Sequence, residues 1–408
     1  MAGVDTATAH WLATPAGRQA IEAAGAHGHD PLAAAAALRR DRPDLGPGQA
    51  SAALEQAGLR RLAHERYGID ARRLLLTRAG LEQATRPQVA ARRATLLRAS
   101  GVRRVLDLTA GLGFDAAACA AAGLAVRALE RDPVTAALCR HNWPQVEVVD
   151  ADATDPGALA AELARLAPTD AVFADPARRD PDGPRDARLR AVPERDPARW
   201  APPWPWLAAL PHPRVAAKVA PSLAAPAGWH AEWSSVHRVV VECAVYSWPA
   251  FAEERRAVVW AGGEAAVVPA GRSDLPAPAD ELGAWLHEPD PAVVKAGAVA
   301  TLLAGHPRVR PLGPHSTWLT GPDEWPGPAA RAFEVIGPLD GSVREQRRRL
   351  DGLAVAALTV KSRDTGVAPA TVLRELGRRE GPGHVVVLTR MGDRSIRVLC
   401  RPARGRPA

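Results

Sequence analysis

An aspartate followed by a glycine-rich loop lies in residues 105–115, whose sequence is VLDLTAGLGFD. Asp107 ends an apolar run, and Thr109, Gly111 and Gly113 follow it in that order. Glycines let the backbone turn tightly and approach a ligand closely. A helix that begins at such a loop points free N–H groups at an anion. These four residues are therefore candidates for binding a ligand with a negatively charged group.

Acidic residues also follow the next two apolar runs. Glu130 comes after residues 125–129, where a carboxylate can accept hydrogen bonds from both hydroxyls of a ribose. Asp152, in VVDADATD, can accept a hydrogen bond from an adenine amino group. The pattern indicates a nucleoside ligand. Alternatives for the two roles are Asp132, Asp150 and Asp155.

Asp175 and Pro176 follow a fourth apolar run, in AVFADPARRD. A carboxylate there can orient an amino or hydroxyl nucleophile and stabilise the charge that develops on it, although a helix-capping role is an alternative. Arg178 and Arg179 can clamp a phosphate or stack on a base, and a solvated turn explains them equally well. Lys218 is one of only three lysines and lies inside an apolar run, which suggests a position near the active site. Alternatively, it lies at the end of a strand and extends its charged group to solvent.

The elements that must position these residues alternate between strands and helices. Strands are expected at 105–108, 125–129, 146–149, 171–174, 214–219 and 239–246, and helices at 116–122, 133–142 and 157–166. Nearly continuous apolar strands alternating with helices predict a parallel sheet covered on both faces. Ligands bind such sheets beyond the carboxyl ends of the strands, which is where the candidate residues lie.

The flanking regions differ in composition. Residues 1–95 predict a helical region, including one helix over 81–97 with a basic stripe. A linker rich in Pro, Ala and Gly is expected at 263–283, followed by a helix within 288–305. From residue 332 onward the pattern predicts a small α/β module that ends in a hairpin across Gly392 and Asp393.

Composition narrows the class of protein and its partners. The formal net charge of +7 favours a polyanion such as nucleic acid, although codon bias toward arginine can also raise the isoelectric point. No apolar run approaches a membrane span, and no leader segment is evident, so a cytoplasmic protein without a membrane partner is expected. The four cysteines form no Cys-x-x-Cys pair, and the histidines show no metal spacing. No metal is therefore expected.

Together, VLDLTAGLGFD, ALERD, DADATD and FADPARR resemble class I S-adenosylmethionine-dependent methyltransferases. The segments FEVIGP, AALTVKSRDTGVAPATVLRELGRR and HVVVLTRMGDRSIRVLCRP resemble the THUMP-like domain that ends a group of bacterial methyltransferases. The resemblance implies a Rossmann-like α/β fold with a helical N-terminal region. It divides the chain into a helical region (1–95), a methyltransferase domain (96–265), a linker and helical connector (266–330) and a THUMP-like domain (331–403).

The resemblance further implies S-adenosylmethionine as cofactor, bound by the glycine loop with Glu130 and Asp152, and Asp175 at the acceptor. THUMP domains bind structured RNA, so tRNA or rRNA is the expected substrate. Residues 347–349, Lys361, Arg363 and Arg390 are the candidates for gripping it. One departure from the base-methylating relatives is the motif Asp-Pro-Ala-Arg, which lacks their second proline and the aromatic residue that stacks on the base.

Three alternatives remain open at this point. The pattern Gly-x-Gly-x-x-Ala also fits a looser dinucleotide site, although Asp107 and three further residues separate the strand from the first glycine. The second alternative is a non-catalytic RNA-binding protein with a vestigial cofactor pocket. A methyltransferase with a small-molecule or protein acceptor is the third alternative.

Overall fold

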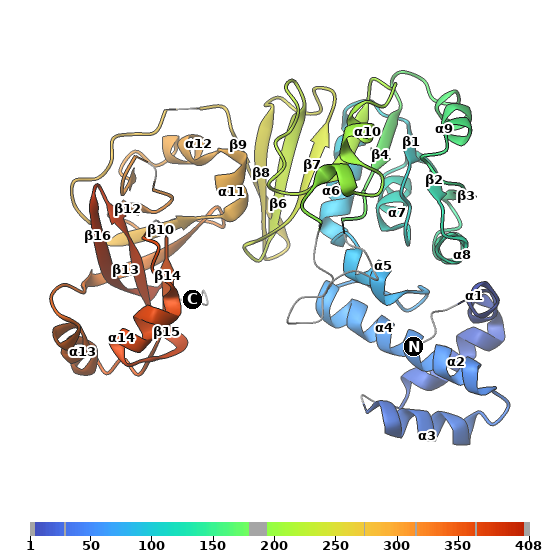
Figure 1. The fold of residues 1–408 in the computed structure, drawn as a ribbon, viewed down its shortest axis with the longest axis horizontal. Coiled ribbons are helices and arrows are strands. Elements are labelled where there is room, and N and C mark those ends of the chain that lie inside the picture. Colours follow the sequence, from blue (N-terminus) through green and yellow to red (C-terminus); the bar gives the residue numbers. More distant parts are fainter. Residues whose placement is uncertain are drawn as a thin grey trace. The chain divides into compact units, whose positions relative to one another are not determined.

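A computed structural model describes residues 5–27, 30–178, 194–272, 274–314, 316–363 and 365–403. The chain forms two compact units. The first unit comprises Met1–Val219, Pro226–Trp229 and Ala244–Ala252, and the second comprises Ala220–Ala225, His230–Cys243 and Glu253–Ala408. Figure 1 labels the helices and strands in chain order.

The first unit begins with a group of helices, as the sequence predicts. Asp5, Thr14 and Asp30 each accept a hydrogen bond from a backbone N–H in the first turn of the helix that follows. The helices are α1 (Thr6–Ala13), α2 (Pro15–Gly25), α3 (Pro31–Asp41), α4 (Pro47–Tyr67), α5 (Arg78–Gln83) and α6 (Pro87–Ala99).

The prediction of one helix over 81–97 is wrong, because the chain forms α5 and α6 with a break between them. Pro87 begins α6, since a proline fits the first turn of a helix but not its interior. The expected basic stripe is also incomplete. Arg93 is buried, while Arg92 next to it is only partly exposed.

A parallel sheet follows the helices in the same unit, and this prediction is confirmed. Its strands run in the order β3-β2-β1-β4-β5, with β7 next to β5, and the pairings among β1 to β5 are parallel. The order reverses between β1 and β4, where ligands bind in such folds. These strands are β1 (Arg104–Asp107), β2 (Ala125–Glu130), β3 (Glu147–Asp150), β4 (Ala171–Ala174) and β5 (Val215–Val219), together with the end of β7 (Val239–Tyr246) from Ala244 onward.

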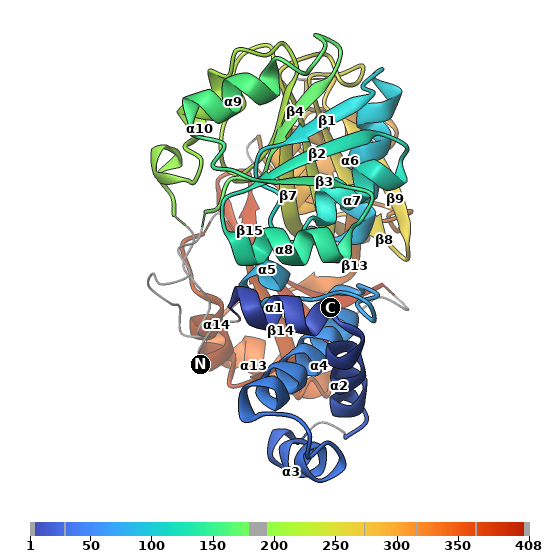
Figure 2. The same cartoon turned by 90° about the vertical axis from the view of Figure 1, so that its right-hand side faces the viewer.

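Helices connect and cover these strands, and Figure 2 shows α7 and α8 beside β1 to β3. Every residue of β4 is buried, which explains its continuous apolar run. The apolar side chains of β1 and β2 pack with those of α7 in one core. The helices are α7 (Phe114–Ala121), α8 (Pro133–Asn142), α9 (Pro156–Leu163) and α10 (Trp204–Ala208), with a short 3₁₀ turn at Pro197–Arg199.

The second unit begins with strands that the sequence analysis missed. They are β6 (His230–Val236), β8 (Arg255–Ala261) and β9 (Glu264–Pro269), in the order β6-β8-β9. Residues 239–243 of β7 belong to this unit as well. The prediction of a linker from residue 263 is therefore wrong over β9, because Gly262 and Gly263 turn the chain back and β9 pairs antiparallel with β8.

The rest of this unit contains a seven-stranded sheet in the order β11-β12-β10-β13-β16-β15-β14. The predicted C-terminal α/β module is present, and three strands of the predicted connector (β10 to β12) join its sheet. The elements are β10 (Trp285–Pro289), α11 (Pro291–Ala296), α12 (Val299–Ala304), β11 (Arg310–Pro311), β12 (Leu319–Gly321), β13 (Ala330–Pro338), α13 (Val343–Gly352), β14 (Ala357–Ser362), α14 (Pro369–Leu376), β15 (Arg379–Met391) and β16 (Arg394–Pro402).

The helix predicted within 288–305 is two short helices, α11 and α12, which meet at Gly297. Glycine commonly ends a helix because it adopts the left-handed backbone conformation without a Cβ clash. None of the helices within the described ranges is long and apolar enough to cross a membrane.

Candidate functional site

A cavity of about 530 Å³ opens where β1, β2, β3 and β4 end. Its volume falls within the roughly 300–1,000 Å³ that small-molecule sites occupy. The helices before the sheet contribute to the wall through Thr77, Gly80 and Gln83, which the sequence analysis did not anticipate. The sequence-predicted residues that line the cavity are Thr109, Gly111, Gly113, Glu130, Asp152 and Asp175.

Glu130, at the end of β2, holds the glycine loop in place. Its Oε2 accepts a hydrogen bond from the backbone N–H of Gly111 at 2.8 Å, and its Oε1 accepts one from the N–H of Asp132 at 2.9 Å. Each carboxylate oxygen has a second lone pair. Glu130 can therefore support the loop and still accept hydrogen bonds from two hydroxyls of a ligand in the cavity.

The two glycines are required for different reasons. Gly113 begins α7 with φ at +81°, and a Cβ there would lie 2.5 Å from Cδ1 of Trp143 and 2.6 Å from Sγ of Cys139. Gly111 has φ at +54°, and a Cβ there would meet open space. Since Gly111 also forms part of the cavity wall, its lack of a side chain leaves room for a ligand.

Asp107 lies beneath the loop, only 1 % exposed, and it is not among the residues that line the cavity. Its Oδ1 accepts a hydrogen bond from the N–H of Thr109 at 2.9 Å, and the hydroxyl of Thr109 accepts one from the N–H of Asp175 at 2.6 Å. Burial raises the pKa of Asp107 to about 7, against the lowering effect of the Thr109 N–H. The structure thus gives Asp107 a supporting position, and its contact with a ligand stays a prediction.

Asp152 is exposed at the cavity and is oriented by Thr154. Its Oδ1 accepts hydrogen bonds from the N–H and the hydroxyl of Thr154 at 2.8 and 2.7 Å, and these bonds lower the pKa of Asp152. The three alternatives have other partners. Asp150 pairs with Arg140, while Asp132 and Asp155 cap the helices α8 and α9. Of these three, only Asp132 also lines the cavity.

Lys218, which the sequence placed near the active site, forms an ion pair with Asp175. Its Nζ also donates a hydrogen bond to Oγ1 of Thr85 at 2.7 Å and lies 3.7 Å from Oδ2 of Asp115. Asp115 in turn pairs with the buried Arg93 and accepts a hydrogen bond from Thr85 at 2.6 Å. The structure therefore joins Asp175 to three residues that the sequence analysis missed.

Opposing effects set the charge of Asp115. Burial by itself raises its pKa, but the positive charges of Arg93 and Lys218 and the hydrogen bond from Thr85 outweigh burial, so the pKa is lowered. Asp115 is consequently ionised at neutral pH. Its carboxylate thus gives the ammonium group of Lys218 a second negative charge besides that of Asp175.

The segment after β4 brings an aromatic ring to the cavity. Ala177 pairs with Ala201 through two backbone hydrogen bonds of 2.8 and 3.1 Å, and Trp200 lines the cavity together with both alanines. The guanidinium group of Arg178 lies 5.8 Å from the centre of the Trp200 ring. Trp200 was missed because it lies 25 positions after Asp175, although the run RWAPPWPW is rich in tryptophan.

Pro176 is buried. Arg179, a candidate from the sequence, lies outside the described residues. Across the described ranges, no group of three or more His, Cys, Asp or Glu side chains is arranged to hold a metal ion.

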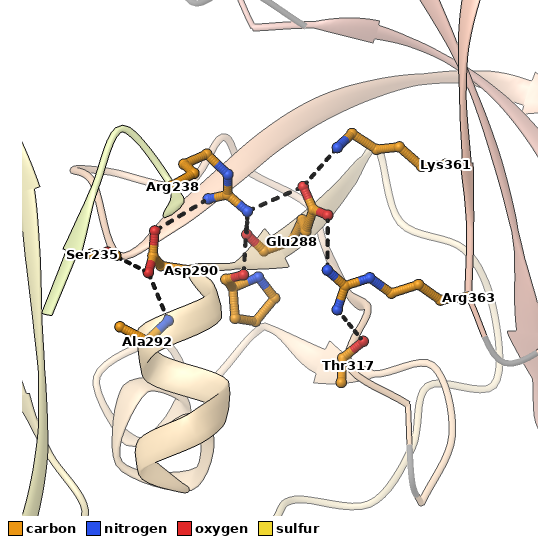
Figure 3. A network of polar contacts seen from close by, with 9 residues as sticks. Ser235, Arg238, Glu288, Asp290, Ala292, Thr317, Lys361 and Arg363 are labelled. Atoms are coloured by element: carbon orange, nitrogen blue, oxygen red, sulfur yellow. Dashed lines mark hydrogen bonds and ion pairs between the residues drawn. The ribbon is translucent and has the colours of Figure 1, made fainter. Parts of the chain in front are cut away.

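The remaining candidates, Lys361, Arg363 and Arg390, belong to the second unit. Figure 3 shows the buried Glu288 between Lys361, Arg363 and Arg238. Its carboxylate oxygens lie 3.1 Å from Nζ of Lys361, 3.3 Å from Nη2 of Arg363 and 3.1 Å from Nη2 of Arg238. Arg390 is exposed and donates to the carbonyl of Asp393 at 2.8 Å.

The charge network around Glu288 limits what its two basic candidates can do. Burial by itself raises the pKa of Glu288, but the positive charges of Lys361 and Arg238 outweigh burial. The pKa is therefore lowered and the carboxylate is ionised. A phosphate that approached Lys361 or Arg363 would compete with this carboxylate. In the described part of the chain, the contact of Arg390 is with a backbone carbonyl rather than a carboxylate.

Comparisons with known proteins agree on the type of domain. Residues 5–63 match the model of a domain of unknown function, residues 75–147 match a family described as "Putative SAM-dependent methyltransferase", and residues 330–402 match the family "THUMP domain-like". Two curated proteins of Mycobacterium tuberculosis, from strains CDC 1551 and H37Rv, are each described as an "Uncharacterized S-adenosylmethionine-dependent methyltransferase".

Each of these curated relatives is 30% identical to this chain over 350 residues, which is 81% of this chain and 89% of the relative. A crystal structure of a "putative methyltransferase" from Porphyromonas gingivalis W83 covers 98% of both chains with a TM-score of 0.68 and 20% identity. At 20% identity, the similarity to this crystal structure shows a shared fold.

Proposed function

The chain belongs to the S-adenosylmethionine-dependent methyltransferase family, and from this premise we propose that it methylates RNA. In this proposal tRNA or rRNA supplies the acceptor, and the THUMP-like module of residues 331–403 helps to bind it. The match of residues 330–402 to the THUMP-like family carries the choice of RNA, because related modules in general bind structured RNA.

The residues around the cavity fit S-adenosylmethionine. The open space beside Gly111, the carboxylates of Glu130 and Asp152, and the N-terminus of α7 match the shape and polarity of an adenosine with a charged amino-acid tail. We assign the ribose to Glu130, the adenine amino group to Asp152, and the carboxylate of the tail to the loop of Thr109, Gly111 and Gly113. Asp107 supports that loop from below. The bound cofactor supplies an electrophilic methyl group on a sulfonium ion.

Asp175 is the residue that we assign to the acceptor. Lys218 contacts Oδ2 of Asp175. We propose that Oδ1 of Asp175 accepts a hydrogen bond from an N–H or O–H group of the acceptor. Held in this way, Asp175 orients the nucleophile and stabilises the positive charge that develops on it. Pro176 fixes the turn that presents Asp175, and the ion pair with Lys218 holds the carboxylate in place.

Trp200 offers a replacement for the aromatic residue that the Asp-Pro-Ala-Arg motif lacks. Trp200 lines the same cavity as Asp175 and is only 2 % exposed, so in this proposal the segment around it moves to let its ring stack on a base that leaves its helix. Arg178, beside the ring, adds a positive charge for the phosphate backbone or extends the stack. Arg179 keeps its predicted substrate contact as part of the proposal.

Helix α13 supplies the exposed positive charge that RNA binding needs in the THUMP-like module. Arg344 and Arg348 lie one turn apart on it and are exposed, whereas Arg347 and Arg349 donate to backbone carbonyl groups nearby. We include Lys361, Arg363 and Arg390 as predicted phosphate contacts. Because Glu288 already holds Lys361, the α13 arginines are the stronger candidates.

The decisive experiment is methylation of total cellular RNA by the purified full chain with a radiolabelled methyl donor, followed by mass analysis of the nucleosides. Asp175→Asn is expected to lower the rate about 100-fold or more and to leave binding of S-adenosylhomocysteine nearly unchanged. Asp280→Asn, an exposed carboxylate far along the chain, is the matched control. Label in protein, or none in any nucleoside, would contradict an RNA acceptor.

The contribution of the THUMP-like module needs charge reversal, because deletion of residues 331–403 would remove β13, the partner of β10. Arg344→Glu combined with Arg348→Glu is expected to weaken RNA binding and to lower the slope of log affinity against log salt by about 2. Reversal of Arg39 and Arg40 on α3 is the control. An unchanged slope would contradict phosphate contacts by α13.

A further inference from the structure

A second cavity, of about 720 Å³, lies in the N-terminal helices and has no part in the methyl-transfer site. Helix α2 lines it with Ile21, Glu22 and Gly25, and helix α4 lines it with residues spaced three or four apart along one face. The segment after α4 completes the wall with residues 70–72. This cavity is larger than the candidate cofactor cavity.

Two arginines that are adjacent in the sequence line this cavity. Arg60 and Arg61 are both partly buried. The Nε of Arg60 donates to the carbonyl of Leu74 at 2.9 Å, and burial lowers the pKa of Arg60 in spite of the charge of Glu22. Nη1 of Arg61 is buried and has no hydrogen-bond partner in the described part of the chain. A buried, unsatisfied donor of a charged group is costly, so an acceptor is expected to meet it.

The charges around the two arginines favour an anion. Asp70 is held by Arg72 through hydrogen bonds of 2.9 and 2.6 Å, which leaves Glu22 and Glu65 as the exposed acids of the wall. The pKa of His141 is lowered by burial and then by the positive charges of Arg18 and Arg60. Glu22 and Glu65 are exposed, whereas Arg60 and Arg61 are partly buried, so the less exposed of these charges are positive.

The remaining lining is small and apolar. Ile21, Ala57 and Ala71 are buried, and Gly25 adds no side chain. Such a surface suits an uncharged ring next to an anionic group. The planar fork of arginine binds phosphate through two parallel hydrogen bonds.

We propose that this cavity binds the phosphate group of a nucleotide through Arg60 and Arg61, with the nucleoside against Ile21, Ala57 and Ala71. A free mononucleotide and the 5′-phosphorylated end of an RNA share this chemistry. The site is separate from the methyl-transfer cavity and does not depend on the acceptor proposed above.

The test is calorimetry on the full chain saturated with S-adenosylhomocysteine, which keeps the probes out of the cofactor cavity. The probes are uridine monophosphate, uridine, and a uridine trinucleotide with or without a 5′-phosphate. We expect the monophosphate to bind at least about tenfold more tightly than uridine, because the phosphate adds charge-assisted hydrogen bonds. A 5′-phosphorylated trinucleotide that binds as well as the monophosphate identifies an RNA end as the source, and one that binds much less identifies the free nucleotide.

Arg61→Gln is expected to weaken binding of the monophosphate about tenfold or more. Its stability against urea without ligand should be at least that of the wild type, because Nη1 of Arg61 loses no protein partner and an unsatisfied buried donor is removed. Arg40→Gln, an exposed arginine on α3, is the matched control and should change affinity less than about twofold. Affinity for S-adenosylhomocysteine should be the same in all three proteins.

Gly25→Glu provides a second, independent variant. A Cβ at Gly25 meets no atom within 4 Å, so the protein should fold, and the new carboxylate at the cavity should repel the phosphate. The proposal is overturned if the monophosphate gives no heat at millimolar concentration. Equal binding of monophosphate and uridine, or unchanged binding in both Arg61→Gln and Gly25→Glu, would overturn it as well.

Discussion

The buried carboxyl group of Asp107 makes a quantitative prediction about stability. Its pKa is about 7 in the folded protein and near 3.8 when the group is solvated. The folded protein therefore retains a proton that the unfolded chain releases between about pH 4 and pH 7, and stability falls as pH rises through that window. A shift of about 3 pKa units corresponds to about 4 kcal/mol once both states are ionised.

Asp107→Asn removes this penalty while keeping the shape of the side chain. The amide oxygen can still accept the hydrogen bond from the N–H of Thr109, which Oδ1 accepts in the wild type. Between pH 5 and pH 8, the wild type is expected to lose about 3 kcal/mol of unfolding free energy that the variant retains. The difference between variant and wild type should therefore grow by that amount over the interval.

Urea unfolding at pH 5, 6, 7 and 8, followed by tryptophan fluorescence, measures this difference. A chain with two compact units can unfold in more than one step, so the relevant transition is the one that S-adenosylhomocysteine shifts. Asp152→Asn is the control, because Thr154 lowers the pKa of Asp152 and the effect of that residue is confined to acidic pH. Parallel stability curves for wild type and Asp107→Asn would refute the reasoning.

Three further predictions concern other parts of the molecule. Lys218→Met should lower the methylation rate and leave the binding of S-adenosylhomocysteine nearly unchanged, because the ammonium group contacts Asp175 rather than the loop; a KM effect alone would argue against this. Gly113→Ala should lower the melting temperature and weaken binding of the cofactor product, since its Cβ would lie 2.5 Å from Trp143; thermal scans with and without S-adenosylhomocysteine check it, and a fully stable variant would exclude the clash. Glu288→Gln should destabilise the second unit by about 3 kcal/mol, because Lys361 and its neighbours lose a buried counter-charge. Since the pKa of Glu288 is lowered in the folded protein, the stability advantage of the wild type should shrink as pH falls toward 4 and below. Urea unfolding at pH 4 and pH 7 measures this, and a difference that does not change with pH would contradict it.

Local sequence patterns determined the elements of the methyltransferase sheet and the order of its candidate residues. Apolar runs mark β1, β4 and β5 because most of their residues are buried, whereas β3 at the sheet edge is only partly buried. Acidic residues and glycines follow the runs directly. Since parallel strands place their carboxyl ends at one edge, these patterns alone predict that Glu130, Asp152 and Asp175 line one cavity, and they do.

Other boundaries were decided by neighbours in the sheet rather than by the local sequence. The residues of β9 alternate weakly and lie in a region rich in Pro, Ala and Gly, yet they form a strand because β8 supplies hydrogen-bond partners. The break before Pro87 shortened a helix that periodicity alone had extended. In both cases the residue that turns or breaks the chain is visible in the sequence. Whether a strand or a helix formed beside it depended on the elements that pack against it.

The partners of the ionised residues were decided by tertiary structure alone. Lys218 and Thr85 are 133 positions apart and share a hydrogen bond, and Lys361 and Glu288 are 73 positions apart and share another. No periodicity links such positions, because the contacts depend on how whole elements pack. The sequence therefore determined which groups could do chemistry, whereas the fold determined which of their charges are buried, which are neutralised, and which face the cavity.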